Sequence, residues 1–130
     1  MALILLIDDD KDVRETLARS LSFAGHNVEY AKDGAAGLGF LKKSKPDVVI
    51  CDILMPEKEG IETILEIRNS NPGMPIIAMS GGGDYSSDKR GFADDNLESA
   101  CLFGANYALR KPFRPAELLE LVKKAVAGTK

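Results

Sequence analysis

The sequence predicts one α/β domain in which helices cover both faces of a five-stranded parallel sheet. Short apolar segments alternate with amphipathic stretches along all 130 residues, and no internal repeat or low-complexity tract interrupts the alternation. Three of the apolar segments are apolar at nearly every position, which is typical of parallel strands that are covered on both faces. Five units of strand followed by helix, joined by right-handed crossovers, therefore account for the chain.

Each element follows from a local pattern. Strands are expected where apolar residues are densest, at residues 3–7, 28–31, 48–51, 76–79 and 107–109. Helices are expected where apolar residues recur at helical spacing, and the residues that mark them are Val13, Leu17, Leu21 and Ala24, then Ile61, Ile64 and Leu65, then Leu118, Leu119, Val122 and Val126. Weaker patterns predict two more helices, at 35–42 and 97–103.

The first helix has a defined start and end. Asp10, followed by Lys11 and Asp12, is expected to cap the helix. Its side chain can accept hydrogen bonds from free backbone N–H groups, and its negative charge interacts favourably with the helix dipole. Gly25 is placed to end the helix as a left-handed residue. Asp10 is therefore assigned a structural role rather than a role as a metal ligand.

Composition and charge exclude several classes of function. The chain is 45% hydrophobic and 28% charged, as globular proteins are. Its formal charge of -3 and isoelectric point near 5.2 argue against direct nucleic-acid binding, because no large basic face is present. The longest apolar run is too short to cross a bilayer, and residues 2–7 lack a positive leader, so a cytoplasmic location without membrane association is expected. Cys51 and Cys101 are expected to be small buried residues in a reducing compartment.

Polar residues follow four of the five expected strands. Asp8 and Asp9 follow the first strand, Asp52 the third, Ser80 the fourth and Lys111 the fifth. The carboxyl ends of parallel strands share one edge of the sheet, and ligands bind there at the point where the strand order reverses. Two like charges about 5 Å apart cost roughly 3 kcal/mol at an effective dielectric of ~20, so the acids need compensation. A divalent cation removes this cost, and all-oxygen ligands favour Mg²⁺.

Taken singly, most of these residues have simpler explanations. Asp8 and Asp9 could interact with a helix dipole alone, Ser80 before three glycines could belong to a turn, and Lys111 could be a surface lysine. Asp52 is harder to explain, since a carboxylate that follows an apolar strand needs a partner. The shared position of all five residues at strand ends favours one site.

Four stretches together resemble the receiver domain of two-component response regulators, including the chemotaxis regulator. They are Asp8 and Asp9 after the first strand, CDILMPEKEG at 51–60, MSG at 79–81 and RKPF at 110–113. The resemblance covers essentially the whole chain and implies a single receiver domain over residues 1–130. It also implies a flavodoxin-like (βα)5 fold, a doubly wound parallel five-stranded sheet of order 2-1-3-4-5.

The resemblance assigns the metal ligands. It implies that Asp9 binds Mg²⁺ directly and that Asp8 binds it through water. Asp52 and the backbone carbonyl of Leu54 are the other implied ligands.

The resemblance also assigns the phosphoryl chemistry. Asp52 is the implied phosphoryl acceptor, Ser80 hydrogen-bonds the phosphoryl group, and Lys111 forms an ion pair with it. The peptide bond between Lys111 and Pro112 is expected to be cis, as it commonly is in the family.

The function that the resemblance implies is that of a phosphoaccepting signalling module. Its partner would be a sensor histidine kinase or a phosphotransfer protein, and the domain would catalyse only its own phosphorylation and its own slow dephosphorylation. A downstream protein or output domain is implied but not named, and none is expected within the chain, because the residues after Lys111 suffice for one closing helix. A monomer or weak dimer is expected.

Two features depart from the family pattern. The residue three positions before the lysine is usually aromatic, but here it is Ala108, and the neighbouring Tyr107 should point to the opposite face of the strand. The link between the fourth and fifth strands is longer than usual, with a lengthened segment around 81–96 that is rich in glycine, serine and charge. This segment either carries the output signal or is a passive insertion.

Two other functions remain open. A Mg²⁺ phosphohydrolase of the haloacid-dehalogenase type would use Asp8 as its nucleophile, because its first strand also ends in Asp-x-Asp. That motif has Thr or Val where this chain has Asp12, and it leaves Asp52 without a role. The second is a degenerate receiver that binds partners without being phosphorylated, and the complete acidic set together with Lys111 argues against it.

Overall fold

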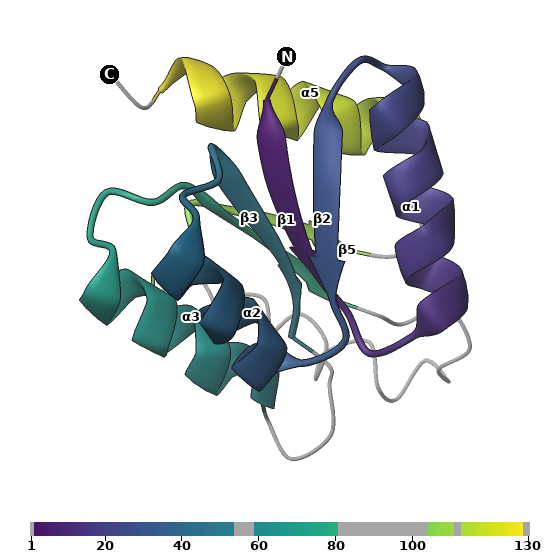
Figure 1. The fold of residues 1–130 in the computed structure, drawn as a ribbon. Helices are drawn as coiled ribbons and strands as arrows, with labels where there is room; N and C mark the ends of the chain where they lie inside the picture. The colour runs from purple at the N-terminus through teal and green to yellow at the C-terminus, as the bar shows by residue number, and fades with distance from the viewer. Residues whose placement is uncertain (1, 54–58, 81–103, 111–112, 129–130) are drawn as a thin grey trace, which may run out of the picture.

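The computed structural model describes residues 2–53, 59–80, 104–110 and 113–128 (Figure 1). Its elements in chain order are β1 (Leu3–Ile7), α1 (Lys11–Phe23), β2 (Asn27–Ala31), α2 (Gly34–Lys43), β3 (Val48–Asp52), α3 (Glu59–Ser70), β4 (Ile76–Ser80), β5 (Tyr107–Arg110) and α5 (Pro115–Ala127). The five strands lie within one residue of their predicted ends. The helix predicted at 97–103, the lengthened segment around 81–96 and Cys101 lie outside the described residues. None of the helices in the described ranges has the length and hydropathy that crossing a bilayer requires.

The five strands form one parallel sheet of order β2-β1-β3-β4-β5, which confirms the flavodoxin-like arrangement. β1 pairs with β2 on one side and with β3 on the other, so the strand order reverses beside β1. In Figure 1 the arrowheads of β1, β2 and β3 point to the same edge, at the bottom of the view. Residues that follow these strands therefore meet at one edge of the sheet.

Helices cover both faces of the sheet, and alternate strand residues supply the two cores (Figure 1). Ile4 and Leu6 of β1 join the core under α1 and α5, whereas Leu5 and Ile7 join the core under α2 and α3. All four side chains are at most 1% exposed. Each such burial contributes roughly 1.5–3 kcal/mol, so β1 is fixed from both sides.

Both predicted ends of α1 are confirmed. The Asp10 side chain accepts hydrogen bonds from the backbone N–H groups of Asp12 at 2.9 Å and Val13 at 3.3 Å, which is the geometry of a helix cap. Gly25 has a φ of 100°, a left-handed conformation that glycine adopts without steric cost. The chain thus turns directly from α1 into β2.

Two residues expected in the core lie elsewhere. Leu65 is 41% exposed, and Ile67 is the buried residue of that turn of α3. The buried positions of α3 are Gly60, Thr63, Ile64 and Ile67, a stripe at helical spacing, and Leu65 is rotated by about 100° from Ile64 toward solvent. Ala24 is also exposed, because α1 ends at Phe23 and Ala24 is its C-terminal cap.

Candidate functional site

Three carboxylates meet at the carboxyl edge of the sheet. The side chains of Asp8, Asp9 and Asp52 each bring an oxygen within 4.8 Å of the others. The register explains the meeting, because Ile7 of β1 pairs with Cys51 of β3, so the next residue of each strand lies at the same level. Asp8 is fully buried and Asp52 is 5% exposed, whereas Asp9 is exposed and leaves one side of the cluster open to solvent. The predicted convergence of these three acids is confirmed.

Hydrogen bonds to the neighbouring described residues hold Asp8 in place. Its backbone N–H donates to the carbonyl of Ala31 at 3.1 Å, which extends the pairing of β1 with β2 by one residue. Its carboxylate accepts from the backbone N–H of Asp10 at 2.9 Å. Its carbonyl accepts from the guanidinium of Arg14 at 2.8 Å. The position of the buried carboxylate is therefore set by α1 and β2 together.

Asp52 is the last residue of β3, and its place is set by the backbone around it. It pairs with Met79 of β4, and the N–H of the following Ile53 donates to the Met79 carbonyl at 2.8 Å. Gly60 of α3 packs directly against the backbone of Asp52 and Ile53, where a Cβ atom would overlap them. Cys51 is fully buried, as expected. Close backbone packing thus fixes the direction in which Asp52 leaves the strand.

The acidic cluster fits a magnesium ion. Three carboxylates this close repel one another by roughly 3 kcal/mol per pair at an effective dielectric of ~20. The donors are all oxygens, and Mg²⁺ typically takes one or two carboxylates, several waters and a phosphate oxygen. Asp9 faces solvent, so water or a phosphate can reach the cluster from its side. The donor set and its open side therefore match what this ion requires.

Ser80 reaches the same edge by its backbone. It is the last residue of β4 and follows Met79, the partner of Asp52. Ser80 pairs with Arg110, the residue before Lys111 in the sequence. The Ser80 side chain is not described, and Lys111, Pro112 and Leu54 lie outside the described residues. The roles predicted for these residues therefore remain predictions.

The strand that leads to Lys111 is anchored at its other end by Arg68 of α3. The Arg68 guanidinium donates to the carbonyls of Gly104 and Pro72, each at 2.6 Å, and to the side chain of Asn106 at 2.8 Å. The Asn106 side chain in turn accepts from the N–H of Ile76. Burial lowers the pKa of the Arg68 guanidinium below its ordinary value, which still leaves it charged at neutral pH. This clamp fixes the start of β5 against β4.

The missing aromatic residue is not replaced by its neighbour. Tyr107 pairs with Ile77 and packs in the core under α1 and α5, whereas Ala108 pairs with Ala78 on the other face. The strand has not slipped, so Tyr107 does not take the position of Ala108. This confirms the orientation expected from strand alternation.

Arg14 is a residue of the site that sequence reasoning did not identify. It lies on α1, contacts the Asp8 carbonyl, and places its guanidinium carbon 5.7 Å from the centre of the Tyr30 ring on β2. A usable signal was its position four residues after the Asp10 cap and directly after Val13 of the inward-facing stripe. Charged residues next to an apolar stripe usually face solvent, so the pattern alone did not assign Arg14 to the site.

Comparison with known proteins identifies the family. Residues 4–123 match the family model of the response regulator receiver domain. Response regulator MprA of Mycobacterium sp. (strain KMS) is 36% identical over 126 residues, which is 97% of this chain and 51% of that protein. The chain therefore spans about half the length of the curated relatives that it matches.

Solved structures agree with this match. The receiver domain protein (CheY-like) from Methanospirillum hungatei JF-1 is 28% identical with a TM-score of 0.84, over 99% of this chain and 96% of that one. The receiver domain protein from Clostridium thermocellum is 30% identical with a TM-score of 0.84, over 98% of this chain and 95% of that one. The match over almost the whole chain decides against a haloacid-dehalogenase-type phosphohydrolase with Asp8 as its nucleophile. The chain belongs to the response regulator receiver domain family of two-component signalling systems.

Proposed function

We propose that Asp52 is the residue on which this receiver domain is phosphorylated. A carboxylate oxygen of Asp52 attacks the phosphorus of a phosphohistidine in line, the phosphorus–nitrogen bond breaks, and the imidazole leaves with a proton. Hydrolysis later returns the carboxylate and inorganic phosphate. The observation that carries the proposal is the meeting of Asp52 with Asp8 and Asp9 at the strand-order reversal of the sheet.

The other acidic residues of the site are proposed to bind the metal. Asp8 and Asp9, with Asp52 and the carbonyl of Leu54, are the proposed ligands of Mg²⁺, which when bound offsets negative charge on the phosphoryl oxygens. Asp9 is the exposed acid and is suited to direct contact, whereas Asp8 is buried and suited to contact through water.

Two further side chains would contact the phosphoryl group. Ser80 would donate a hydrogen bond to one phosphoryl oxygen, and Lys111 would pair with another. Support comes from the pairing of Ser80 with Arg110, since this register brings the ends of β4 and β5 level with Asp52.

The partners follow from this chemistry. The phosphoryl group would come from a sensor histidine kinase or a phosphotransfer protein, and we propose that the domain acts in the cytoplasm, where ATP supplies such kinases. The domain would catalyse only its own phosphorylation and dephosphorylation. A downstream protein or output domain would read the phosphorylated state, without direct contact of this domain with nucleic acid, and the domain would be a monomer or weak dimer.

Intact-mass measurement after incubation with acetyl phosphate and Mg²⁺ tests the proposal. The native protein should gain the mass of one phosphoryl group, and chelation of Mg²⁺ should prevent the gain. Asp52→Asn should gain none, because an amide is not a nucleophile toward phosphorus under these conditions. Asp47→Asn is the matched control, since Asp47 is exposed and precedes β3 at the opposite edge of the sheet.

Two results would contradict the proposal. An adduct that persists in Asp52→Asn would mean that another residue accepts the phosphoryl group. A native protein that gains no mass, although it is folded and binds Mg²⁺, would support the degenerate receiver instead.

A further inference from the structure

Arg14 connects the three elements that surround Asp8. It lies on α1, its Nη1 donates to the carbonyl of Asp8 after β1 at 2.8 Å, and its guanidinium carbon lies 5.7 Å from the centre of the Tyr30 ring of β2, within cation–π range. The Tyr30 ring supports the planar guanidinium and limits its rotation. The residue after Tyr30 is Ala31, whose carbonyl accepts from the N–H of Asp8. Arg14 and β2 thus hold the two peptide groups on either side of the Asp8 Cα atom.

The hydrogen bonds around Arg14 form a closed ring. The Arg14 backbone N–H donates to the carbonyl of Asp10 at 2.9 Å, and the Asp10 N–H donates to the Asp8 carboxylate at 2.9 Å. The Arg14 side chain closes the ring at the Asp8 carbonyl. The carboxylate and the carbonyl of Asp8 are therefore both tied to the first turns of α1.

Among the described residues, the buried Nε of Arg14 has no hydrogen-bond partner. A buried donor that lacks an acceptor is unfavourable, and such groups are rare and call for an explanation. A local cost of this kind is expected where a side chain is held in place by a functional demand. Arg14 therefore keeps its contact with Asp8 at the expense of its own hydrogen bonding.

We propose that Arg14 is a positioning residue for the acidic site. It fixes the main chain at Asp8, so that the carboxylates of Asp8, Asp9 and Asp52 keep the spacing that Mg²⁺ binding requires. The inference rests on the proposed function, because it assigns Arg14 to the metal site of that function. Arg14 touches neither the metal nor the phosphoryl group in this role.

Positioning and simple electrostatics predict opposite results when the charge of Arg14 is removed. A guanidinium close to a metal site repels the cation, so a purely electrostatic Arg14 would weaken Mg²⁺ binding, and its removal would strengthen binding. A positioning Arg14 gives the reverse, because loss of an outer contact that orients a ligand weakens metal binding, commonly by about ten- to a hundredfold. The sign of the change therefore separates the two roles.

Calorimetric titration with magnesium chloride alone, without a phosphoryl donor, provides the test. We expect Arg14→Met to raise the Mg²⁺ dissociation constant about tenfold. Arg14→Lys should restore binding to within about threefold of native, because an ammonium can still donate to the Asp8 carbonyl and make a cation–π contact with the Tyr30 ring. Arg19→Met is the matched control, since Arg19 is an exposed arginine of the same helix and its loss changes the net charge equally. Its dissociation constant should equal that of the native protein.

A second pair of variants keeps the test valid if Arg14→Met does not fold. Tyr30 is 52% exposed, so its replacement leaves the core intact. Tyr30→Leu removes the ring that orients Arg14 and should weaken Mg²⁺ binding about threefold. Tyr30→Phe keeps the ring and should bind as the native protein does.

The possible failures are distinct. Native Mg²⁺ affinity in Arg14→Met or in Tyr30→Leu, or tighter binding in either, would overturn the positioning role of Arg14 while leaving the phosphorylation of Asp52 untouched. A native protein that binds no Mg²⁺ would overturn the metal site itself. Weaker binding in Arg14→Met that Arg14→Lys fails to restore would also contradict the proposal.

Discussion

At the scale of single residues, the proposed acceptor Asp52 depends on a neighbour that has no side chain. Gly60, in the first turn of α3, packs against the backbone of Asp52 and Ile53, and a Cβ atom at this position would overlap the Asp52 carbonyl and the Ile53 Cα. Backbone atoms cannot move aside as a flexible side chain can, so a larger residue would displace either α3 or the end of β3. The geometry of Asp52 thus depends on the absence of a Cβ atom at residue 60.

Gly60→Ala should therefore lower both stability and phosphorylation. Overpacking of this kind typically costs about 1–3 kcal/mol, measured as the free energy of unfolding in urea. The phosphorylation rate with acetyl phosphate should fall as well, because Asp52 moves with its carbonyl. In the control Gly39→Ala on α2, a Cβ atom meets nothing within 4 Å, and the helix should gain about 0.5–1 kcal/mol. A Gly60→Ala protein with native stability and rate would refute this packing argument.

Single-residue features that act within one turn of chain could be predicted from the sequence. The cap at Asp10 and the left-handed Gly25 are of this kind, because the physical cause and its signal are a few residues apart. The contact of Gly60 with Asp52 and that of Arg14 with Asp8 depend on how α3 and α1 pack on the sheet. Local sequence gives no signal of the Gly60 contact, and for Arg14 it gives only a position beside the inward-facing stripe of α1.

At the scale of helices and strands, the apolar pattern predicted the strands well because the central strands are buried on both faces. β1 and β3 are buried along almost their whole length, so burial leaves little freedom in where they begin and end. The apolar pattern of α3 was less decisive. Ile61, Ile64 and Leu65 fit helical spacing as well as the stripe that is buried in the structure. Packing selected the stripe that includes Ile67.

The difference between Ile67 and Leu65 is measurable. Ile67 is fully buried against the core under α2 and α3, so Ile67→Ala should lose about 2–5 kcal/mol of unfolding free energy. Leu65 is 41% exposed, and Leu65→Ala should lose less than about 1 kcal/mol. Urea denaturation of both variants gives the comparison. Equal losses would show that Leu65 belongs to the core after all.

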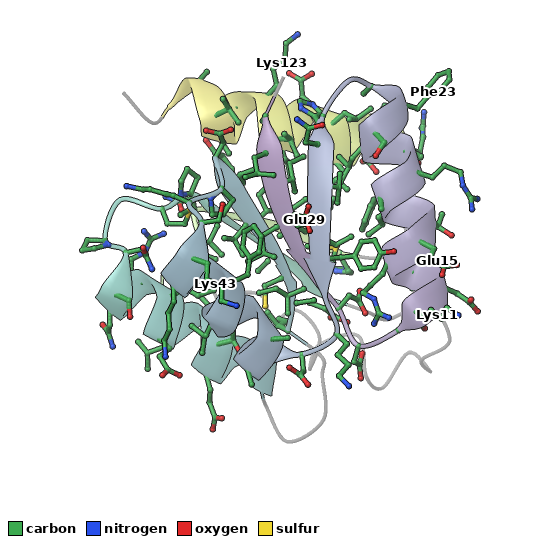
Figure 2. The ribbon with its side chains drawn as sticks, in the orientation of Figure 1. Lys11, Glu15, Phe23, Glu29, Lys43 and Lys123 are labelled. Carbon is green, nitrogen blue, oxygen red and sulfur yellow. The ribbon has the colours of Figure 1, made fainter. Side chains whose placement is uncertain are left out.

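α1 has one side that faces solvent and one side that packs on the sheet. Figure 2 shows Lys11 and Glu15 on the outer side of α1, and Phe23 pointing away from the molecule at the end of the helix. Lys11 and Glu15 approach to 4.0 Å, but both are well exposed, so their ion pair adds little stability. The inward side chains Leu17 and Leu21 hold the helix on the sheet. The inward side of α1 therefore holds the helix on the sheet, and Arg14 contacts Asp8 near this side.

At the scale of the whole molecule, the site is a product of strand order and register. Asp8 and Asp52 are far apart in the sequence, and they meet because β1 lies beside β3 with Ile7 paired to Cys51. Periodicity predicted the strands but not their order, which came from the resemblance to receiver domains. The convergence of the acids then followed, since parallel strands end at one edge.

The central claim is that the carboxylates at this edge hold Mg²⁺ and that Asp52 accepts a phosphoryl group there. The most direct measurement is a crystal structure of the protein with Mg²⁺ and beryllofluoride, which mimics the aspartyl phosphate. We expect beryllium bound to a carboxylate oxygen of Asp52 and Mg²⁺ about 2.0–2.1 Å from oxygens of Asp9 and Asp52, with the Ser80 hydroxyl and the Lys111 ammonium on the fluorides. Beryllofluoride on another residue, or Ser80 and Lys111 directed to other surfaces, would contradict the account.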